Sequence, residues 1–271
     1  MARDEKRTLV QRLTKNIQRA VVRPFKARKE RSFREEDLVD LEEFTGLSRQ
    51  SLLEWLRRDA GRRISDEHQW LRPREAREYG WFYRGSRVYL FSADEAWERA
   101  TALAGPGKRC LDFGGGGGRN SIAMARKGAT VFYVDIGIMN AAFVRFRARK
   151  HGLDITVIDP MVDDAGRWRC DTGEAARRVG GFDLVVADNV LEHVADYHLV
   201  VEKLGQGLAP GGRFLECTPF KREKPYLFGG PAPWDVHLPP TMPMAEAMAR
   251  AGLASVGDGL WERPAGVPAG A

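Results

Sequence analysis

The sequence has few cysteines and no long apolar run. Its 271 residues include 3 cysteines, Cys110, Cys170 and Cys217, with no paired spacing, so we expect reduced thiols rather than a disulfide framework. No apolar run reaches the roughly 20 residues of a membrane-spanning helix, and the basic N-terminus lacks the continuous apolar core of a secretory signal. These absences predict a cytoplasmic globular protein, and we predict no metal site.

The net positive charge of the chain comes from its start. Residues 1–34 contain 12 Lys/Arg and 3 Asp/Glu, whereas the remainder contains 31 and 34, which gives net charges of +9 and −3. Within this arm Leu9, Leu13, Ile17 and Val21 recur every four residues, which predicts an amphipathic basic helix. Three roles remain open: a helix packed on the protein, a helix that binds an anionic membrane surface, and a nucleic-acid contact. The last is the least favoured, because basic charge alone is weak evidence for it.

Residues 35–104 form a second region, which we expect to be a helical, aromatic-rich cap. The spacing predicts helices over 36–43 and 48–58, with Ser48 as an N-cap and Gly46 in the turn between them. A DNA-binding helix-turn-helix is the alternative to a small helical cap. After these helices, residues 66–99 are dense in aromatic side chains and arginines. Gly105-Pro106-Gly107 then breaks the chain and marks a third region, 105–271.

The rest of the chain is organised around residues 110–135, CLDFGGGGGRNSIAMARKGATVFYVD. Residues 110–113 read as a strand, 120–127 as a helix that ends at Gly128, and 130–134 as a second, buried strand. The five glycines between the first strand and the helix have too much backbone entropy to lose for a helix or strand interior. The segment therefore predicts a β-loop-α-β unit whose loop lets a ligand approach the backbone.

The glycine loop does not fit a dinucleotide site. Such a site needs glycines at relative positions one, three and six, and the sixth position is Arg119, Asn120 or Ser121 in the three possible frames. The pattern present is Asp112, then Gly114-x-Gly116-x-Gly118, with Asp135 at the end of the second strand. An acid at that position suits a vicinal diol. The stretch resembles the first two motifs of class I S-adenosylmethionine-dependent methyltransferases, of the type that acts on small molecules.

The resemblance covers roughly 105–256 and implies an α/β fold, a doubly wound, mostly parallel Rossmann-like sheet with an N-terminal helical extension. The remaining pattern predicts helices over 138–151, 197–208 and 242–251, and strands over 155–158, 182–187 and 213–217. On the first of these helices Met139, Ala142, Phe143 and Phe146 are the expected buried side. The family normally ends in a β-hairpin. Only about eighteen residues follow Gly252-Leu253, so the last two strands are expected to be short.

The resemblance also implies the site. Its S-adenosyl-L-methionine contacts would be Asp112, Gly114, Gly116, Gly118, Asp135, Ile136, Asp159 and Asn189. Of these, Asp135 would hold the ribose, and Asn189 would lie near the methionine end. Asp159 would hold the adenine amino group, with Asp163 and Asp164 as alternatives. In this family the aromatic segment before the first strand often covers the cofactor or walls the acceptor site; packing on the sheet is the alternative. If the acceptor is an oxygen of high pKa, it needs a base. The candidates are His193 and His237, each of which could instead be structural.

The expected function is methyl transfer to a small molecule, with the acceptor atom (O, N or C) undetermined. A lipid-linked or saccharide-like acceptor is compatible with the sequence. The alternatives are a methyltransferase acting on nucleic acid or protein, and a regulatory protein that binds the cofactor without catalysis. Intact glycines and both acids favour the enzyme.

Overall fold

The computed structural model describes residues 35–58, 95–159, 161–162, 168–169, 172–194, 196–218 and 241–266. The predicted basic arm, most of the aromatic-rich segment, Cys170 and His237 lie outside these residues. The chain divides into two units, residues 1–39 and 40–271. The described part of the first unit is the start of helix α2.

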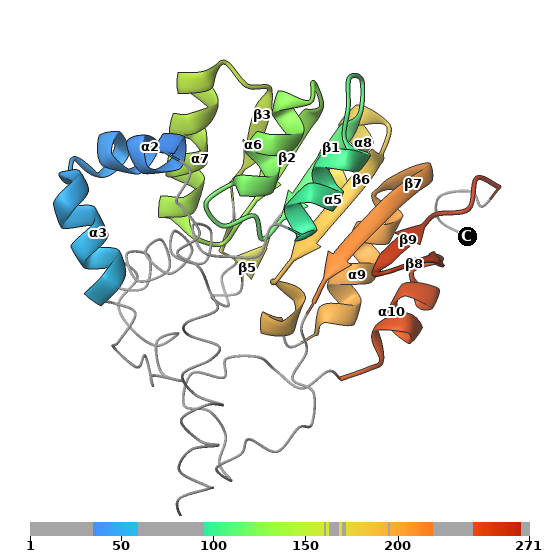
Figure 1. The fold of residues 1–271 in the computed structure, drawn as a ribbon. Helices are drawn as coiled ribbons and strands as arrows, with labels where there is room; N and C mark the ends of the chain where they lie inside the picture. Colours follow the sequence, from blue (N-terminus) through green and yellow to red (C-terminus); the bar gives the residue numbers. More distant parts are fainter. Residues whose placement is uncertain are drawn as a thin grey trace, which may run out of the picture. The chain divides into compact units, whose positions relative to one another are not determined.

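The second unit is built on a seven-stranded sheet with the order β3-β2-β1-β6-β7-β9-β8 (Figure 1). The first five strands in this order are mutually parallel, and β9 and β8 add an antiparallel hairpin at one edge. The strands are β1 Arg109–Phe113, β2 Thr130–Val134, β3 Ile155–Ile158, β6 Phe182–Asp188, β7 Leu208–Cys217, β8 Ala254–Gly257 and β9 Leu260–Glu262. This is the doubly wound, mostly parallel sheet that the sequence predicts.

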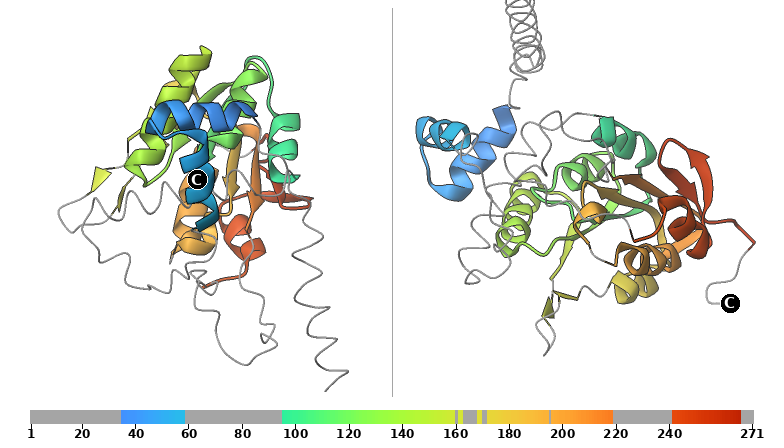
Figure 2. Two further views of the ribbon diagram at one scale, coloured as in Figure 1. Left: turned by 60° about the vertical axis from the view of Figure 1, so that its left-hand side comes forward. Right: turned by 90° about the horizontal axis from the view of Figure 1, so that it is seen from below.

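Helices cover both faces of the sheet (Figure 2). Successive strand residues such as Cys110 and Leu111 point to opposite faces, as strand geometry requires. One face packs on α5 and α6, and on α7 beside β2, and the opposite face packs on α8, α9 and α10. The helices are α2 Glu35–Thr45, α3 Arg49–Arg58, α5 Glu95–Leu103, α6 Arg119–Arg126, α7 Ile138–His151, α8 Thr172–Val179, α9 Tyr197–Gln206 and α10 Met244–Arg250.

Shorter elements complete the unit. A one-turn helix, η2 (Leu191–His193), follows β6, and β4 (Met161–Val162) pairs with β5 (Trp168–Arg169) as a small separate ribbon. Strand β7 starts earlier than expected, because Leu208 pairs with Phe182 before residues 209–212 bulge out and pairing resumes at Arg213. None of the helices in the described ranges is long and apolar enough to span a bilayer.

Helix α7 has the bounds predicted from the sequence, but its buried side differs. Phe143 is fully buried as expected, whereas Met139, Ala142 and Phe146 are only partly buried. The most buried stripe instead contains Ala141, Val144, Arg147 and Ala148. An arginine was not expected there, because a buried charge needs a partner.

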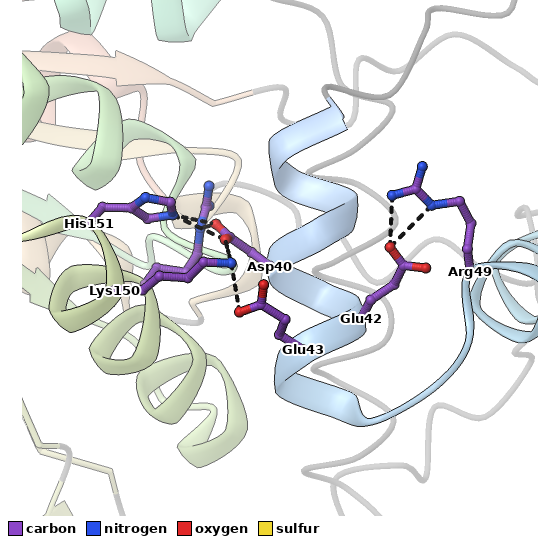
Figure 3. Close-up of polar contacts among 7 residues, drawn as sticks. Asp40, Glu42, Glu43, Arg49, Lys150 and His151 are labelled. Carbon is purple, nitrogen blue, oxygen red and sulfur yellow. Dashed lines mark hydrogen bonds and ion pairs between the residues drawn. The ribbon is translucent and has the colours of Figure 1, made fainter.

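That partner comes from α2. The Asp40 carboxylate accepts from Arg147 Nε at 2.7 Å, and it also contacts Lys150 Nζ at 3.0 Å and His151 Nε2 at 2.9 Å (Figure 3). Next to these polar contacts the Phe44 ring packs on Phe143, with ring centroids 5.1 Å apart. Three cationic or ionisable groups thus converge on one carboxylate, and this part of α2 is fixed on α7.

The turn after α2 follows the sequence prediction. The Ser48 hydroxyl accepts the Ser51 N–H at 3.3 Å at the start of α3, as an N-cap does. Before it, Gly46 has φ +69°, a left-handed conformation that favours glycine. The Arg49 guanidinium then reaches back to the Glu42 carboxylate at 2.8 Å (Figure 3).

Candidate active site

The glycine loop lies where the sheet reverses its strand order, between β1 and its two neighbours β2 and β6. In open α/β sheets such a switch point is the usual place for a ligand, at the carboxyl ends of the strands. Gly114 has φ +70°, and a Cβ there would lie 2.2 Å from Val190 Cγ2, so this position has no room for a side chain. Gly116 has φ +51°, and a Cβ there would meet no described atom within 4 Å, so the loop faces open space at this point.

Asp135 ties the glycine loop to the start of α7. Its Oδ2 accepts the Gly116 N–H at 2.9 Å, and its Oδ1 accepts the Gly137 N–H at 2.7 Å and the Asn140 amide at 3.0 Å. The side chain is buried, and burial raises the pKa of Asp135 although these three donors lower it in part. A carboxylate has about four lone-pair positions, so one acceptor position is left for a hydroxyl.

Asp112 lies behind the loop and is fully buried. Its Oδ2 accepts both the backbone N–H and the hydroxyl of Ser121, at 3.0 and 2.6 Å, whereas Oδ1 has no hydrogen-bond partner among the described residues. Burial raises the pKa of Asp112 to about 7, and the negative charges of Asp188 and Asp135 contribute to the increase. The carboxyl therefore anchors the first turn of α6 and leaves one acceptor oxygen unused.

A second polar group forms at the end of β6. Asn120, in the first turn of α6, donates from Nδ2 to Asp188 Oδ2 at 3.3 Å, and Asn189 donates to Asp188 Oδ1 at 2.7 Å. Asn189 has φ +52°, which is uncommon for a residue other than glycine and is tolerated best by Asn and Asp. Its side chain is exposed, whereas Asn120 is buried and its Oδ1 has no partner among the described residues. These side chains join the glycine loop to the end of β6.

Glu192 and His193 follow on η2. Glu192 is fully buried, and its Oε1 lies 3.9 Å from Nε2 of the partly exposed His193. The pKa of Glu192 is raised to about 7, mainly by burial, and the negative charges of Asp188 and Glu216 contribute to the increase. Such a carboxyl group can exchange a proton near neutral pH, and the adjacent imidazole is accessible to a ligand.

The structure brings most of the predicted site residues to one edge of the sheet. Asp112, Gly114, Gly116, Gly118, Asp135 and Asn189 lie at or next to the carboxyl ends of β1, β2 and β6. Ile136 is half-buried directly after Asp135. Asp159 follows β3, one strand further out, where its exposed carboxylate forms an ion pair with Arg145. His237 lies outside the described residues.

Three polar residues of this edge were not predicted from the sequence. Asn120 binds Asp188, Asn140 binds Asp135, and the Tyr133 hydroxyl donates to the Gly116 carbonyl at 2.6 Å. The two asparagines each lie within the first helical turn after a strand that ends in the site, and that position was the only available signal. Tyr133 lies among the buried apolar residues of β2, and nothing in the sequence marked it as part of the site.

The fold and the glycine loop define the class of protein. The model of the methyltransferase domain family matches residues 86–254, and the chain belongs to this family. It has the sheet order and motifs of a class I S-adenosylmethionine-dependent methyltransferase.

The chain is similar to curated O-methyltransferases. Over 130 residues the chain is 35% identical to the ubiquinone biosynthesis O-methyltransferase of Cronobacter sakazakii, covering 48% of this chain and 49% of that protein. The enzyme of that name from Psychrobacter arcticus is 35% identical over 150 residues, which cover 55% of this chain and 54% of the relative. The chain thus spans about half the length of these curated relatives. Among solved structures, an O-methyltransferase family protein from Burkholderia thailandensis matches with TM-score 0.49 and 18% identity, over 72% of this chain and 60% of that one.

The residues present fit S-adenosylmethionine. The cofactor offers ribose hydroxyls, an ammonium group and a positively charged sulfur. The loop offers open space at Gly116, and two buried acceptor oxygens, Asp112 Oδ1 and Asn120 Oδ1, have no partner among the described residues. Buried acceptor oxygens need hydrogen-bond donors, and a ligand with donor groups and positive charge supplies them.

Proposed function

We propose that this protein transfers the methyl group of S-adenosylmethionine to a hydroxyl group of a small molecule. The observation that carries this proposal is the pair of Glu192 and His193, which lies directly beyond β6, next to the glycine loop. The O-methyltransferases named among the relatives support an oxygen acceptor.

The cofactor supplies a methyl group already activated by the positive charge on its sulfur. The chain then has two tasks: to hold the acceptor oxygen close to that methyl group, and to take the proton of a hydroxyl whose pKa is too high for it to ionise unaided. We assign the second task to His193, because its side chain is partly exposed. The buried Glu192 carboxyl adjoins this imidazole, with its Oε1 3.9 Å from Nε2.

The cofactor half of the site follows from the loop. Gly116 leaves space over the loop backbone, and Asp135, held by three donors, presents its remaining acceptor position to the ribose. Asn189 would hold the methionine end, Ile136 would pack against the adenine ring, and Asp159 would accept from the adenine amino group. Each of these contacts is part of the proposal.

The test is methyl transfer from radiolabelled cofactor to a panel of small phenols, alcohols, thiols and amines. We expect label in the phenol or alcohol products. Label only in amines would contradict the oxygen acceptor. Calorimetry that shows no binding of cofactor or of its demethylated product to the folded protein would contradict the methyltransferase function.

A further inference from the structure

The end of β6 carries a negative charge that no described cation neutralises directly. Asp188 closes β6 beside Ala187, which pairs with Phe113 at the end of β1, so Asp188 lies level with the start of the glycine loop. Val190, two residues on, packs against Gly114. A ligand on the loop is therefore within reach of this carboxylate.

The hydrogen bonds of Asp188 orient its carboxylate without removing the charge. Both donors are neutral amides, Asn120 on Oδ2 and Asn189 on Oδ1, and none of the residues in the described ranges forms an ion pair with it. Burial raises the pKa of Asp188, the two amides lower it, and the charge of Arg119 lowers it further. Asp112 is more deeply buried and faces Ser121, so Asp188 is the better placed of the two to meet a ligand.

The methyl donor and its product differ in charge at one atom. The sulfur of S-adenosylmethionine is positive, and after methyl transfer it is neutral, while the ammonium and carboxylate of the molecule are unchanged. A carboxylate in a partly buried site interacts with such a charge more strongly than it would in water. We propose that Asp188, oriented by Asn120, makes this site bind the methyl donor more tightly than its demethylated product.

This inference rests on the proposed cofactor site and adds to it a charge-selecting residue pair. Its consequence is that the neutral product is released more readily than the positively charged donor, so a new donor molecule displaces the product after each transfer. For this selection Asn120 is a positioning residue, because its Nδ2 acts through Asp188, whereas its Oδ1 is available to the donor and to the product alike.

The experiment measures dissociation constants by calorimetry on the full chain for three ligands. They are S-adenosylmethionine, its demethylated product, and an analogue with a protonated amine in place of the methylsulfonium. In Asp188→Asn, which keeps the shape and removes the charge, we expect the affinity for the two cationic ligands to fall about tenfold and that for the product by less than about threefold. The matched control is Asp196→Asn, which removes an exposed charge near the same edge and should leave all three affinities unchanged.

Asn120→Ser is an independent variant for the same proposal, in case Asp188→Asn does not fold. It should weaken the two cationic ligands by about threefold and the product less, because the carboxylate loses its orientation. Equal weakening of all three ligands in the folded variants, or no weakening, would overturn the inference while leaving the methyltransferase function intact. Failure of the wild type to bind either the donor or the product would instead overturn the function itself.

Discussion

Asp40 and Arg147 are 107 residues apart in the sequence, yet they form an ion pair of 2.7 Å in which both side chains are almost fully buried. Arg147 belongs to α7, whose first turn contributes Asn140 to the network of Asp135. One helix therefore connects the α2 contact with the Asp135 network of the candidate site.

Breaking this ion pair should destabilise the protein strongly. Asp40→Asn is expected to lower the free energy of unfolding in urea by about 3–5 kcal/mol, because it removes the buried carboxylate on which three groups converge. Arg147→Met should cost less, because Lys150 and His151 still contact the Asp40 carboxylate. Asp40→Leu combined with Arg147→Met should recover much of the loss. Glu42→Gln is the control: its pair with Arg49 is partly exposed, and its loss should cost less than about 1 kcal/mol. If Glu42→Gln lowers the free energy of unfolding by a similar amount, burial is not the reason for the cost of breaking the Asp40–Arg147 pair.

The buried carboxyl of Asp112 should make the cofactor-free protein less stable as the pH rises. Its pKa is raised to about 7 in the folded state, mainly by burial, against about 4 in the unfolded chain. The folded state therefore holds this proton more tightly. The resulting stabilisation is complete below pH 4 and is lost as the pH approaches 7.

The change in unfolding free energy from this group is on the order of a few kcal/mol. Asp112→Asn should flatten the part of the stability profile between about pH 4 and 7, measured by urea unfolding at a series of pH values. An unchanged slope in the variant would show that Asp112 is already ionised at low pH. Glu192, whose pKa is also raised to about 7, gives a second group to test with Glu192→Gln.

Asp135 and Asp159 should respond differently to the same substitution. Asp135→Asn is expected to weaken S-adenosylmethionine binding by about 1–3 kcal/mol and to lower the melting temperature, because the carboxylate accepts three hydrogen bonds within the protein. Asp159→Asn should leave the melting temperature nearly unchanged, because that side chain is exposed. Any loss of affinity in Asp159→Asn then reports a direct contact with the cofactor, and full affinity would remove Asp159 from the site.

His193→Ala should lower turnover by about 10²-fold and change cofactor affinity by less than about twofold, as expected for a general base. The control is His198→Ala, which removes an exposed imidazole on α9 that contacts Thr241. His237→Ala tests the other candidate base. If turnover is unchanged in both His193→Ala and His237→Ala, neither histidine is the base, and catalysis rests on positioning.

The basic arm, residues 1–34, carries a net charge of +9 and remains a candidate for binding to an anionic membrane surface. Each basic residue near such a surface contributes about 1 kcal/mol, and salt weakens the attraction. Deleting 1–34 should abolish sedimentation with vesicles that contain anionic lipid and should preserve cofactor binding. Vesicles of neutral lipid are the control. If the full chain ignores anionic vesicles at low salt, the membrane proposal fails; a gel shift with nucleic acid would instead favour that partner.

Local sequence signals determined the elements around the site. The glycine run, the β-branched strand 130–134 and the helix 138–151 have the bounds expected from the residues alone, because turns, strand propensity and helix ends depend on near neighbours. Asp112 and Asp135 were predicted in the same way, because Asp135 directly follows strand 130–134 and Asp112 lies two residues before the glycine run. The last two strands, expected to be short, are present as a four-residue and a three-residue strand that complete the sheet edge.

Only the tertiary structure decided which polar groups meet. Arg147 is buried because Asp40 reaches it from another helix, and Asn120 became part of the site because the loop places it against Asp188, 68 residues away. The predicted buried side of α7 was wrong in part for the same reason: hydrophobic spacing marks apolar residues for burial and gives no weight to a charge whose partner is distant. A hydrogen bond or an ion pair depends on the distance between two groups in space, and helical periodicity and strand alternation specify only how each segment faces its own surroundings.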